Sequence, residues 1–423
     1  GCGARMPRAH TGGLPMRACV GGVIVCLLAA AASAGPLNPP AGAVAPSMKT
    51  LADVEPRTAI NATNTPGDGT AVHVISTAGS YYLTGQVNCP AGKSAIRVTT
   101  QGVRIDLNGF TLSGAAGSLS GVTSGGLGAP DCAVSNGLVK GFGGKGIDLG
   151  NALQARVSGV NVRSCVGGIA VGAGALVSDC VAAGNTGAGF SSMGGRSRFR
   201  GCVSTFNTDG FLGDASFDAF DGCTATGNSN DGFQTNNALL TGCVADDNEG
   251  NGFVGSYADR YSQCRAGYNE ENGFAGANNA VYDGCTAVQN ELVGMSVGSV
   301  ATVRSCLVVS NTQQGIKTGD RCTVTGNQVR FNGAGALAGI WCNGDQNFVE
   351  SNQSTINGYG VFVSGTQNVV VRNTCGNNGV SNYVIPVGNR VGLVTTGTTN
   401  AAAINGNGGG GLGFTDPNAN IAY

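Results

Sequence analysis

The stretch CTATGNSNDGF at residues 223–233 decides the fold, because it returns twice further along the chain. It reappears as CVADDNEGNGF at residues 243–253 and as CRAGYNEENGF at residues 264–274. Each copy begins with a cysteine, has an asparagine five residues later and ends with a Gly-Phe pair. A fixed spacing without helical periodicity indicates a repeat architecture in which equivalent residues stack on one another.

The same spacing continues on both sides of this stretch. Between Cys202 and Cys306 the cysteines are 20 or 21 residues apart. Helical repeats are longer, and leucine-rich repeats would show several leucines in each unit. Short strands separated by Gly and Asn fit better. The sequence therefore predicts an all-β fold, a right-handed parallel β-helix solenoid with about 21 residues per coil. An asparagine follows the cysteine by five residues in eight units, namely Asn185, Asn207, Asn228, Asn248, Asn269, Asn290, Asn311 and Asn327.

Stacked coils would give each repeated residue a defined place. We expect the Cys, Ala and Phe side chains to fill the interior of the solenoid. The asparagines are expected in an inward-facing turn, where their amides would bond coil to coil and satisfy the turn backbone. The glycine before each apolar residue is expected because the turn needs a positive φ.

Composition excludes several classes of function. Glycine accounts for 74 of the 423 residues, only 11% are charged, and the formal net charge is −1. Lysine and arginine do not cluster with aromatic residues, so we expect no nucleic-acid binding. The only histidines are His10 and His73. Their scarcity argues against histidine-dependent triads and most zinc sites.

The ends of the chain differ in texture from the repeats. Residues 1–34 predict a signal peptide, with basic residues, the apolar run ACVGGVIVCLLAAAA and a small-residue cleavage site. We expect a Pro-rich lead-in and N-terminal cap at 35–80, the β-helix at 81–383 and a C-terminal cap at 384–423. Past the signal peptide, no segment is expected to span a membrane. A secreted, extracellular or cell-surface location follows, with the periplasm as an alternative.

Several stretches carry a family resemblance. They are GPLNPPAGAVAPSMKTLADVEPRT, GSYYLTGQV, IDLNGFTLSG, the coils with N-x-x-x-G-F, and the ending DPNANIAY. From about residue 35 to residue 423 the chain resembles a family of secreted bacterial right-handed β-helix repeat proteins in the broad pectin-lyase-like fold group. The resemblance implies the fold, whereas most such proteins have no assigned activity.

The cysteines allow two interpretations. Without the predicted signal peptide 13 of the 16 remain, an odd number that cannot all pair within one chain. The spacing contains no CxxC motif. A disulfide or metal ladder is one interpretation. A buried and mostly reduced stack is the favoured one, because parallel Cβ vectors suit a disulfide poorly.

Acidic residues between the repeated Asn and Gly raise the question of a calcium site. Stacked on one edge, they could offer the several oxygen ligands that Ca²⁺ requires. The alternative is ordinary solvated turn residues. Ca²⁺ is the only cofactor under consideration, and its candidate ligands are Asp209, Asp231, Glu249 and Glu270.

A catalytic interpretation also starts from Asp209. The sequence Asn207-Thr208-Asp209 is similar to the N-T-D motif of polygalacturonases. That resemblance implies paired aspartates that protonate a glycosidic oxygen and activate water. Asp231 would lie one coil above Asp209, and Asp247 is a further candidate. The family's Asp-Asp pair, Gly-His-Gly and Arg-x-Lys motifs are missing, so a coincidence within the repeat is favoured.

Two functions from different classes are therefore carried forward. The first is a non-catalytic extracellular scaffold or glycan-binding surface whose partner is a polysaccharide or a cell-envelope component. The second is a polysaccharide lyase, glycoside hydrolase or epimerase acting on an acidic polysaccharide such as pectin. The near-uniform coils favour the first, and the fold group with its acidic turns favours the second.

Overall fold

The computed structural model describes residues 55–125, 131–213, 217–276, 278–333, 335–396 and 416–423. The chain divides into the compact units Gly1–Glu55 and Pro56–Tyr423, and nearly all described residues belong to the second. The described residues form 45 β-strands and no helix. The predicted signal peptide lies outside the described residues.

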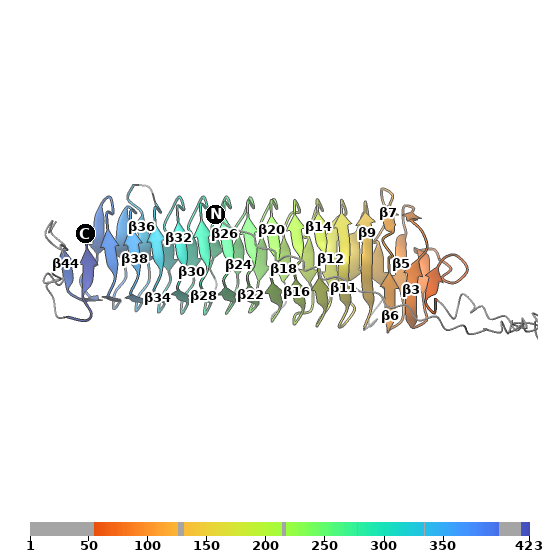
Figure 1. Ribbon diagram of the computed structural model, residues 1–423, viewed down its shortest axis with the longest axis horizontal. Helices are drawn as coiled ribbons and strands as arrows, with labels where there is room; N and C mark the ends of the chain where they lie inside the picture. Colours follow the sequence, from red (N-terminus) through yellow and green to blue (C-terminus); the bar gives the residue numbers. More distant parts are fainter. Residues whose placement is uncertain (1–54, 126–130, 214–216, 277, 334, 397–415) are drawn as a thin grey trace, which may run out of the picture. The chain divides into compact units, whose positions relative to one another are not determined.

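Strands of the unit Pro56–Tyr423 wind into 15 coils with three short strands in a typical coil (Figure 1). Equivalent strands of consecutive coils pair in parallel, as Phe253 does with Phe274. A crossover between parallel strands of one sheet is right-handed in nearly all proteins. The fold is thus the predicted right-handed parallel β-helix, with about 21 residues per coil.

Face 1 of the solenoid is a single parallel sheet of 15 strands. Successive side chains of a strand point to opposite sides, so alternate residues enter the core. The strands are β2 (Ala71–Ile75), β5 (Ser94–Val98), β8 (Val122–Ser124), β10 (Lys145–Leu149), β12 (Gly167–Val171), β15 (Phe190–Ser192), β18 (Phe211–Gly213), β21 (Phe233–Thr235), β24 (Phe253–Gly255), β27 (Phe274–Ala275), β30 (Met295–Val297), β33 (Ile316–Thr318), β36 (Ala338–Cys342), β39 (Tyr359–Val363) and β42 (Ser381–Val384).

Faces 2 and 3 belong to one bent sheet of 30 strands. Strands β9 (Ala133–Lys140) and β11 (Arg156–Arg163) run across both faces. Face 2 further contains β1 (Thr58–Ile60), β3 (Gly79–Leu83), β6 (Val103–Asp106), β13 (Leu176–Ser178), β16 (Arg198–Arg200), β19 (Ala219–Asp221), β22 (Leu239–Thr241), β25 (Arg260–Ser262), β28 (Val281–Asp283), β31 (Thr302–Arg304), β34 (Thr323–Thr325), β37 (Phe348–Glu350), β40 (Val369–Val371) and β43 (Arg390–Val391). Face 3 further contains β4 (Val87–Cys89), β7 (Thr111–Gly114), β14 (Val181–Ala183), β17 (Val203–Thr205), β20 (Thr224–Thr226), β23 (Val244–Asp246), β26 (Arg265–Gly267), β29 (Thr286–Val288), β32 (Leu307–Val309), β35 (Gln328–Arg330), β38 (Gln353–Thr355), β41 (Thr374–Gly376), β44 (Val394–Thr396) and β45 (Asn420–Ala422).

Both sheets extend beyond the limits of 81 and 383 that the sequence suggested for the solenoid. Near the start, β1 pairs in parallel with β3, so the ladder already includes Thr58. Near the other end, β45 pairs with both β41 and β44 and lies between them. Part of each predicted cap therefore continues the sheets.

Aromatic rings stack through the core in the middle of the solenoid, as the sequence predicted. Consecutive Phe rings on face 1 lie 4.6–4.9 Å apart, centroid to centroid, and are nearly parallel. On face 2, Tyr261 and Tyr282 stack at 4.9 Å, and Tyr261 meets Phe274 edge-on at 5.6 Å. Stacked and edge-to-face pairs each add about 0.5–1.5 kcal/mol beyond burial, so this column stabilises the coil-to-coil register.

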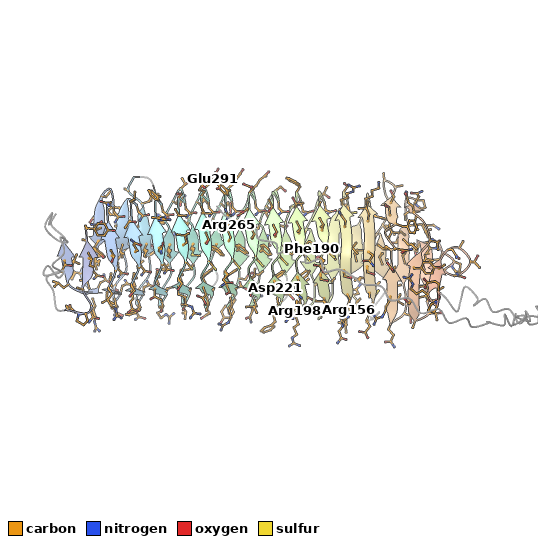
Figure 2. The ribbon with its side chains drawn as sticks, in the orientation of Figure 1. Arg156, Phe190, Arg198, Asp221, Arg265 and Glu291 are labelled. Carbon is orange, nitrogen blue, oxygen red and sulfur yellow. The ribbon has the colours of Figure 1, made fainter. Side chains whose placement is uncertain are left out.

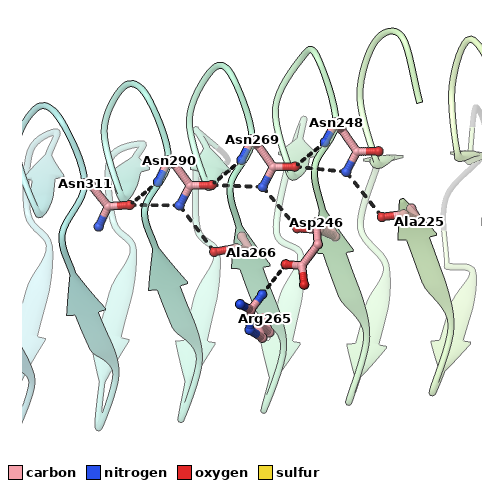
Figure 3. Close-up of polar contacts among 9 residues, drawn as sticks. Ala225, Asp246, Asn248, Arg265, Ala266, Asn269, Asn290 and Asn311 are labelled. Carbon is pink, nitrogen blue, oxygen red and sulfur yellow. Dashed lines mark hydrogen bonds and ion pairs between the residues drawn. The ribbon is translucent and has the colours of Figure 1, made fainter. Parts of the chain in front are cut away.

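The repeated asparagines form a buried hydrogen-bonded ladder, which confirms the predicted inward turn (Figure 3). Nδ2 of Asn248 donates to Oδ1 of Asn269 at 2.9 Å, and Nδ2 of Asn269 donates to Oδ1 of Asn290 at 2.9 Å. The same Nδ2 of Asn269 also reaches the carbonyl oxygen of Ala245 at 3.0 Å. The ladder thereby satisfies polar groups that the turn would otherwise bury without partners.

The prediction of a positive φ at the repeated glycine is wrong. Gly252, for example, is not in the left-handed region. A Cβ there would lie 2.7 Å from the carbonyl oxygen of Gly273 and 2.8 Å from Nδ2 of Asn269. The glycine is therefore required by the close approach of the next coil. Left-handed residues instead precede the cysteine and the asparagine, as at Gly242 (φ 59°) and Asp247 (φ 55°).

Candidate functional site

The structure brings Asp209 and Asp231 to equivalent positions in consecutive coils, where one amide links them. Nε2 of Gln234 lies 3.1 Å from Oδ1 of Asp209 and 3.0 Å from Oδ2 of Asp231. Asn230 donates to Asp209 at 2.7 Å, and the backbone and side chain of Asn251 donate to Asp231 at 2.8 and 3.0 Å. Both carboxylates thus join neighbouring coils through amide groups, as the asparagine ladder does.

The other acidic candidates lie elsewhere on the turn. Asp247 is exposed and precedes a ladder asparagine, whereas Glu249 and Glu270 each follow one and are exposed. The proposed calcium ligands consequently fall into two separate columns. Among the residues that the structure describes, no three His, Cys, Asp or Glu side chains form a group able to hold a metal ion. Binding of Ca²⁺ stays a prediction.

Cysteines 89 to 375 are buried and unpaired, in agreement with the favoured sequence interpretation. In the regular coils they occupy the corner between faces 2 and 3. Burial raises the pKa of the thiols of Cys132, Cys342 and Cys375 to about 12. Neutral, buried thiols are poor nucleophiles and poor metal ligands, so these three cysteines act as small core residues.

Outward side chains on face 1 form an aromatic group near the C-terminal end of the solenoid. Trp341 of β36 pairs in register with Phe362 of β39, and their ring centroids are 6.5 Å apart at 74°. Tyr359 of β39 lies 5.2 Å from Phe362. All three side chains are half-buried. Together with Lys317 of β33, whose Nζ lies 5.0 Å from the centre of the Trp341 ring, they form what we call the aromatic platform.

Strand alternation explains why these rings point outward. In β36 the neighbours of Trp341, Ile340 and Cys342, are fully buried. Two inward side chains leave the residue between them on the outer surface. A hydrogen bond of 3.0 Å from Nε1 of Trp341 to Oγ of Ser364 holds the indole in place, and Lys317 covers part of its face. The platform is consequently ordered before any ligand arrives.

A hollow adjoins the platform. It encloses about 220 Å³ and is lined by apolar residues together with one amide side chain. Next to it, a second hollow of about 680 Å³ shares Ala336 and includes the exposed side chains of Phe331 and Ile356. Both residues have φ near +57°, a conformation that is strained for a β-branched or bulky side chain. The first hollow is lined by Gln314, Ala336, Leu337, Ala338, Trp341, Tyr359 and Phe362.

The four tyrosines of residues 217–330 divide into two groups. Tyr261 and Tyr282 belong to the buried core. Tyr257 and Tyr268 are about half exposed, but they lie on separate coils away from the platform. The sequence reasoning did not single out the platform, although the run Ile340-Trp341-Cys342 contains a usable signal. In a strand, a residue that lies between two buried neighbours points outward. Here that residue is the only tryptophan of the chain.

Comparisons with known proteins agree with the observed fold. Residues 145–275 match a family model described as a right handed beta helix region. Curated protein sequences give no match. Solved structures similar to this chain include the A-module of mannuronan C-5 epimerase AlgE6 from Azotobacter vinelandii, at 18% identity over 74% of this chain and 89% of that chain, with a TM-score of 0.46.

Two further solved structures carry other functions on a similar chain path. PfbA, a surface adhesin of Streptococcus pneumoniae, is 11% identical over 76% of this chain and 84% of that chain, with a TM-score of 0.32. The catalytic unit of an α-1,3-glucanase from Streptomyces thermodiastaticus is 11% identical over 79% and 67%, with a TM-score of 0.32. The strand pairing and the matched family model define the chain as a right-handed parallel β-helix protein, a class whose functions must be argued from the site. No helix among the described residues is long and apolar enough to cross a membrane.

Proposed function

We propose that this protein binds a glycan without chemically changing it, and that the aromatic platform is its binding site. The observation that carries the proposal is the group of outward rings on adjacent strands β36 and β39. Surface aromatic rings of this kind offer a flat apolar face with polar groups at the edge. A pyranose ring presents the matching features, because its C–H face is apolar and its hydroxyls lie around the rim.

Polar groups around the platform suit a sugar rather than a purely apolar ligand. Nζ of Lys317 and the amide of Gln314 stand beside the rings, where they can bond to hydroxyl or acidic groups. Sites of this type combine an apolar floor with a few fixed polar groups that set orientation. The hydrogen bond from Trp341 to Ser364 reduces the entropy lost on binding.

Separate observations favour binding over hydrolysis. The only predicted catalytic residues that meet are Asp209 and Asp231, and amide groups of neighbouring coils already bond to both. A hydrolase needs one carboxyl group that gives up a proton to the leaving oxygen. The partner under this proposal is a polysaccharide or a cell-envelope glycan, and export to the cell exterior remains part of the prediction.

Pull-down with insoluble polysaccharides tests the proposal. Trp341→Ala and Phe362→Ala are expected to weaken binding at least about tenfold, because each removes a stacking face. Tyr257→Ala is the control, since it removes an exposed aromatic ring away from the platform. The parent protein and the Asp231→Asn protein should both leave the chain length of the glycan unchanged. Equal binding by the platform variants and the parent protein, or cleavage lost only in the Asp231→Asn protein, would contradict the proposal.

A further inference from the structure

Three arginines occupy one outward column on face 2 in every second coil. Arg104 pairs in register with Ala133, Ala133 with Arg156, Arg156 with Leu176, and Leu176 with Arg198. The three arginines are exposed, whereas Ala133 and Leu176 between them are half-buried. Charged and apolar positions therefore alternate along the axis of the solenoid. We call Arg104, Arg156 and Arg198 the arginine row.

The spacing of the row follows from the fold. Neighbouring strands of a sheet lie about 4.8 Å apart, so residues two coils apart are separated by about 10 Å. Figure 2 shows Arg156 and Arg198 extending from the same side of the solenoid, on the side opposite to Glu291. The pairing of the strands sets the Cα atoms of the three arginines at a regular interval.

The carboxylates that the structure describes near the arginine row do not form ion pairs with its guanidinium groups, so these groups can bind a ligand. Among the described residues, no carboxylate oxygen lies within ion-pair distance of any of the three guanidinium groups. Asp106, on the same strand as Arg104, is held by Arg57 at 2.8 Å. Asp131 is the one acidic residue on the rim of a hollow of about 380 Å³ between Arg104 and Arg156.

Net charge is distributed unevenly around this column. Residues 93–200 contain ten Lys or Arg and four Asp or Glu, whereas residues 217–330 contain six and twelve. The coils that carry the row are thus basic, and the following coils are acidic. Such a field attracts an anion to the basic coils and turns it away from the acidic ones.

We propose that the arginine row binds a linear polysaccharide that carries an acidic group on every second sugar. One sugar of an extended chain advances by a distance similar to one coil, so alternate sugars meet alternate coils. Guanidinium groups bind carboxylates through two parallel hydrogen bonds. Ala133 and Leu176 then provide the apolar surface that the intervening neutral sugars contact. This surface lies on face 2 and does not depend on the aromatic platform of face 1.

Calorimetric titration with hyaluronan, which carries one carboxylate per disaccharide, tests the inference. The row variant combines Arg104→Gln, Arg156→Gln and Arg198→Gln. The control variant combines Arg163→Gln, Arg321→Gln and Arg330→Gln, which removes the same charge from exposed arginines outside this column. We expect the row variant to bind at least about tenfold more weakly, and the control within about twofold of the parent protein.

Two further arms separate the explanations. Carboxyl-reduced hyaluronan should not bind, and added salt should weaken binding of native hyaluronan. The row lies on face 2, so failure of the platform variants to weaken pull-down would leave this result intact. The inference is overturned if the parent protein does not bind, if the row and control variants lose equal affinity, or if the carboxyl-reduced polymer binds equally well.

Discussion

Oδ1 of Asn269 accepts two hydrogen bonds from Asn248, one from Nδ2 at 2.9 Å and one from the backbone N–H at 3.2 Å. Nδ2 of Asn269 in turn donates to the next asparagine and to the carbonyl oxygen of Ala245. One buried amide thus completes the hydrogen bonding of three coils. Hydrogen bonds in the water-free interior are stronger than in water, and a buried polar group that loses its partner destabilises the fold.

Replacing Asn269 by Ala should destabilise the solenoid substantially. The change leaves the buried N–H of Asn248 without its acceptor and leaves its Nδ2 with only the carbonyl oxygen of Ala225, and each unsatisfied N–H costs about 1–3 kcal/mol. We expect the free energy of unfolding in urea to fall by about 3 kcal/mol. Asn343→Ala is the control, because Asn343 is exposed. Equal urea midpoints for both variants would contradict a structural role of the ladder.

Glycines of the two kinds found here should respond differently to substitution. Gly252→Ala places a Cβ against the Gly273 carbonyl oxygen, so a loss of about 2 kcal/mol or more is expected. Gly222 has φ 59° and open space around its Cα. Gly222→Asn should cost less than about 1 kcal/mol, because asparagine tolerates this conformation. Thermal unfolding of the two variants measures the difference. If the repeated glycine is needed for its backbone angle rather than for space, Gly252→Ala should not lose more stability than Gly222→Asn.

Buried Asp259 makes stability depend on pH. Burial raises its pKa from the usual 3.8 to about 6, and its Oδ1 accepts the backbone N–H of Ala238 at 2.7 Å. Between about pH 4 and 6 the folded chain retains a proton that the unfolded chain has lost. Stability from this group is therefore present at low pH and is lost as the pH rises through 6.

Asp259→Asn should therefore stabilise the protein at pH 7 by about 2–3 kcal/mol and have little effect at pH 4. The asparagine keeps the acceptor for Ala238 and removes the buried charge. Urea unfolding at a series of pH values measures the difference. Asp247→Asn, at an exposed position, should leave the pH profile unchanged. A destabilised Asp259→Asn protein at pH 7 would show that the buried charge is itself stabilising.

The thirteen cysteines from 89 to 375 should resist alkylation in the folded protein. They are buried in the core, where the alkylating reagent cannot reach the sulfur atoms. Mass spectrometry after iodoacetamide treatment should find these positions unmodified without denaturant and fully modified in urea. Modification at rates typical of exposed thiols, or disulfides among these positions, would contradict the buried reduced stack.

Repeat spacing was sufficient to predict the fold, because each regular coil repeats the same inward residues. The Cys, Asn and Phe positions of residues 223–274 could be assigned to the core or the turn without coordinates. The role of the repeated glycine was misjudged, since its constraint comes from the next coil rather than from its own backbone. Contacts between stacked coils are not visible in a single repeat.

Functional residues were harder to predict, since the solvent-facing positions do not repeat. Asp209 and Asp231 did prove to be neighbours. Their shared partner Gln234 lies on β21, the strand that follows the turn of Asp231, and the direction of its side chain depends on where that strand begins. The aromatic platform pairs Trp341 with Phe362 at the regular spacing of 21 residues, but the equivalent outward positions of the two preceding coils, Ser296 and Lys317, are not aromatic. Extra residues between β35 and β36 lengthen the step from Lys317 to Trp341 to 24 residues, so the regular spacing does not place Lys317 beside the tryptophan.

Intrinsic fluorescence tests the central claim most directly, because Trp341 is the only tryptophan of the chain. A glycan that stacks on the platform must change the emission of this residue, so titration reports binding at one known position. We predict a saturable change in emission with the polysaccharide that is retained in pull-down, and loss of that saturation in Phe362→Ala. Binding of that polysaccharide to the row variant, which lacks the arginine row, with unchanged tryptophan emission would place the site elsewhere and contradict the proposed function.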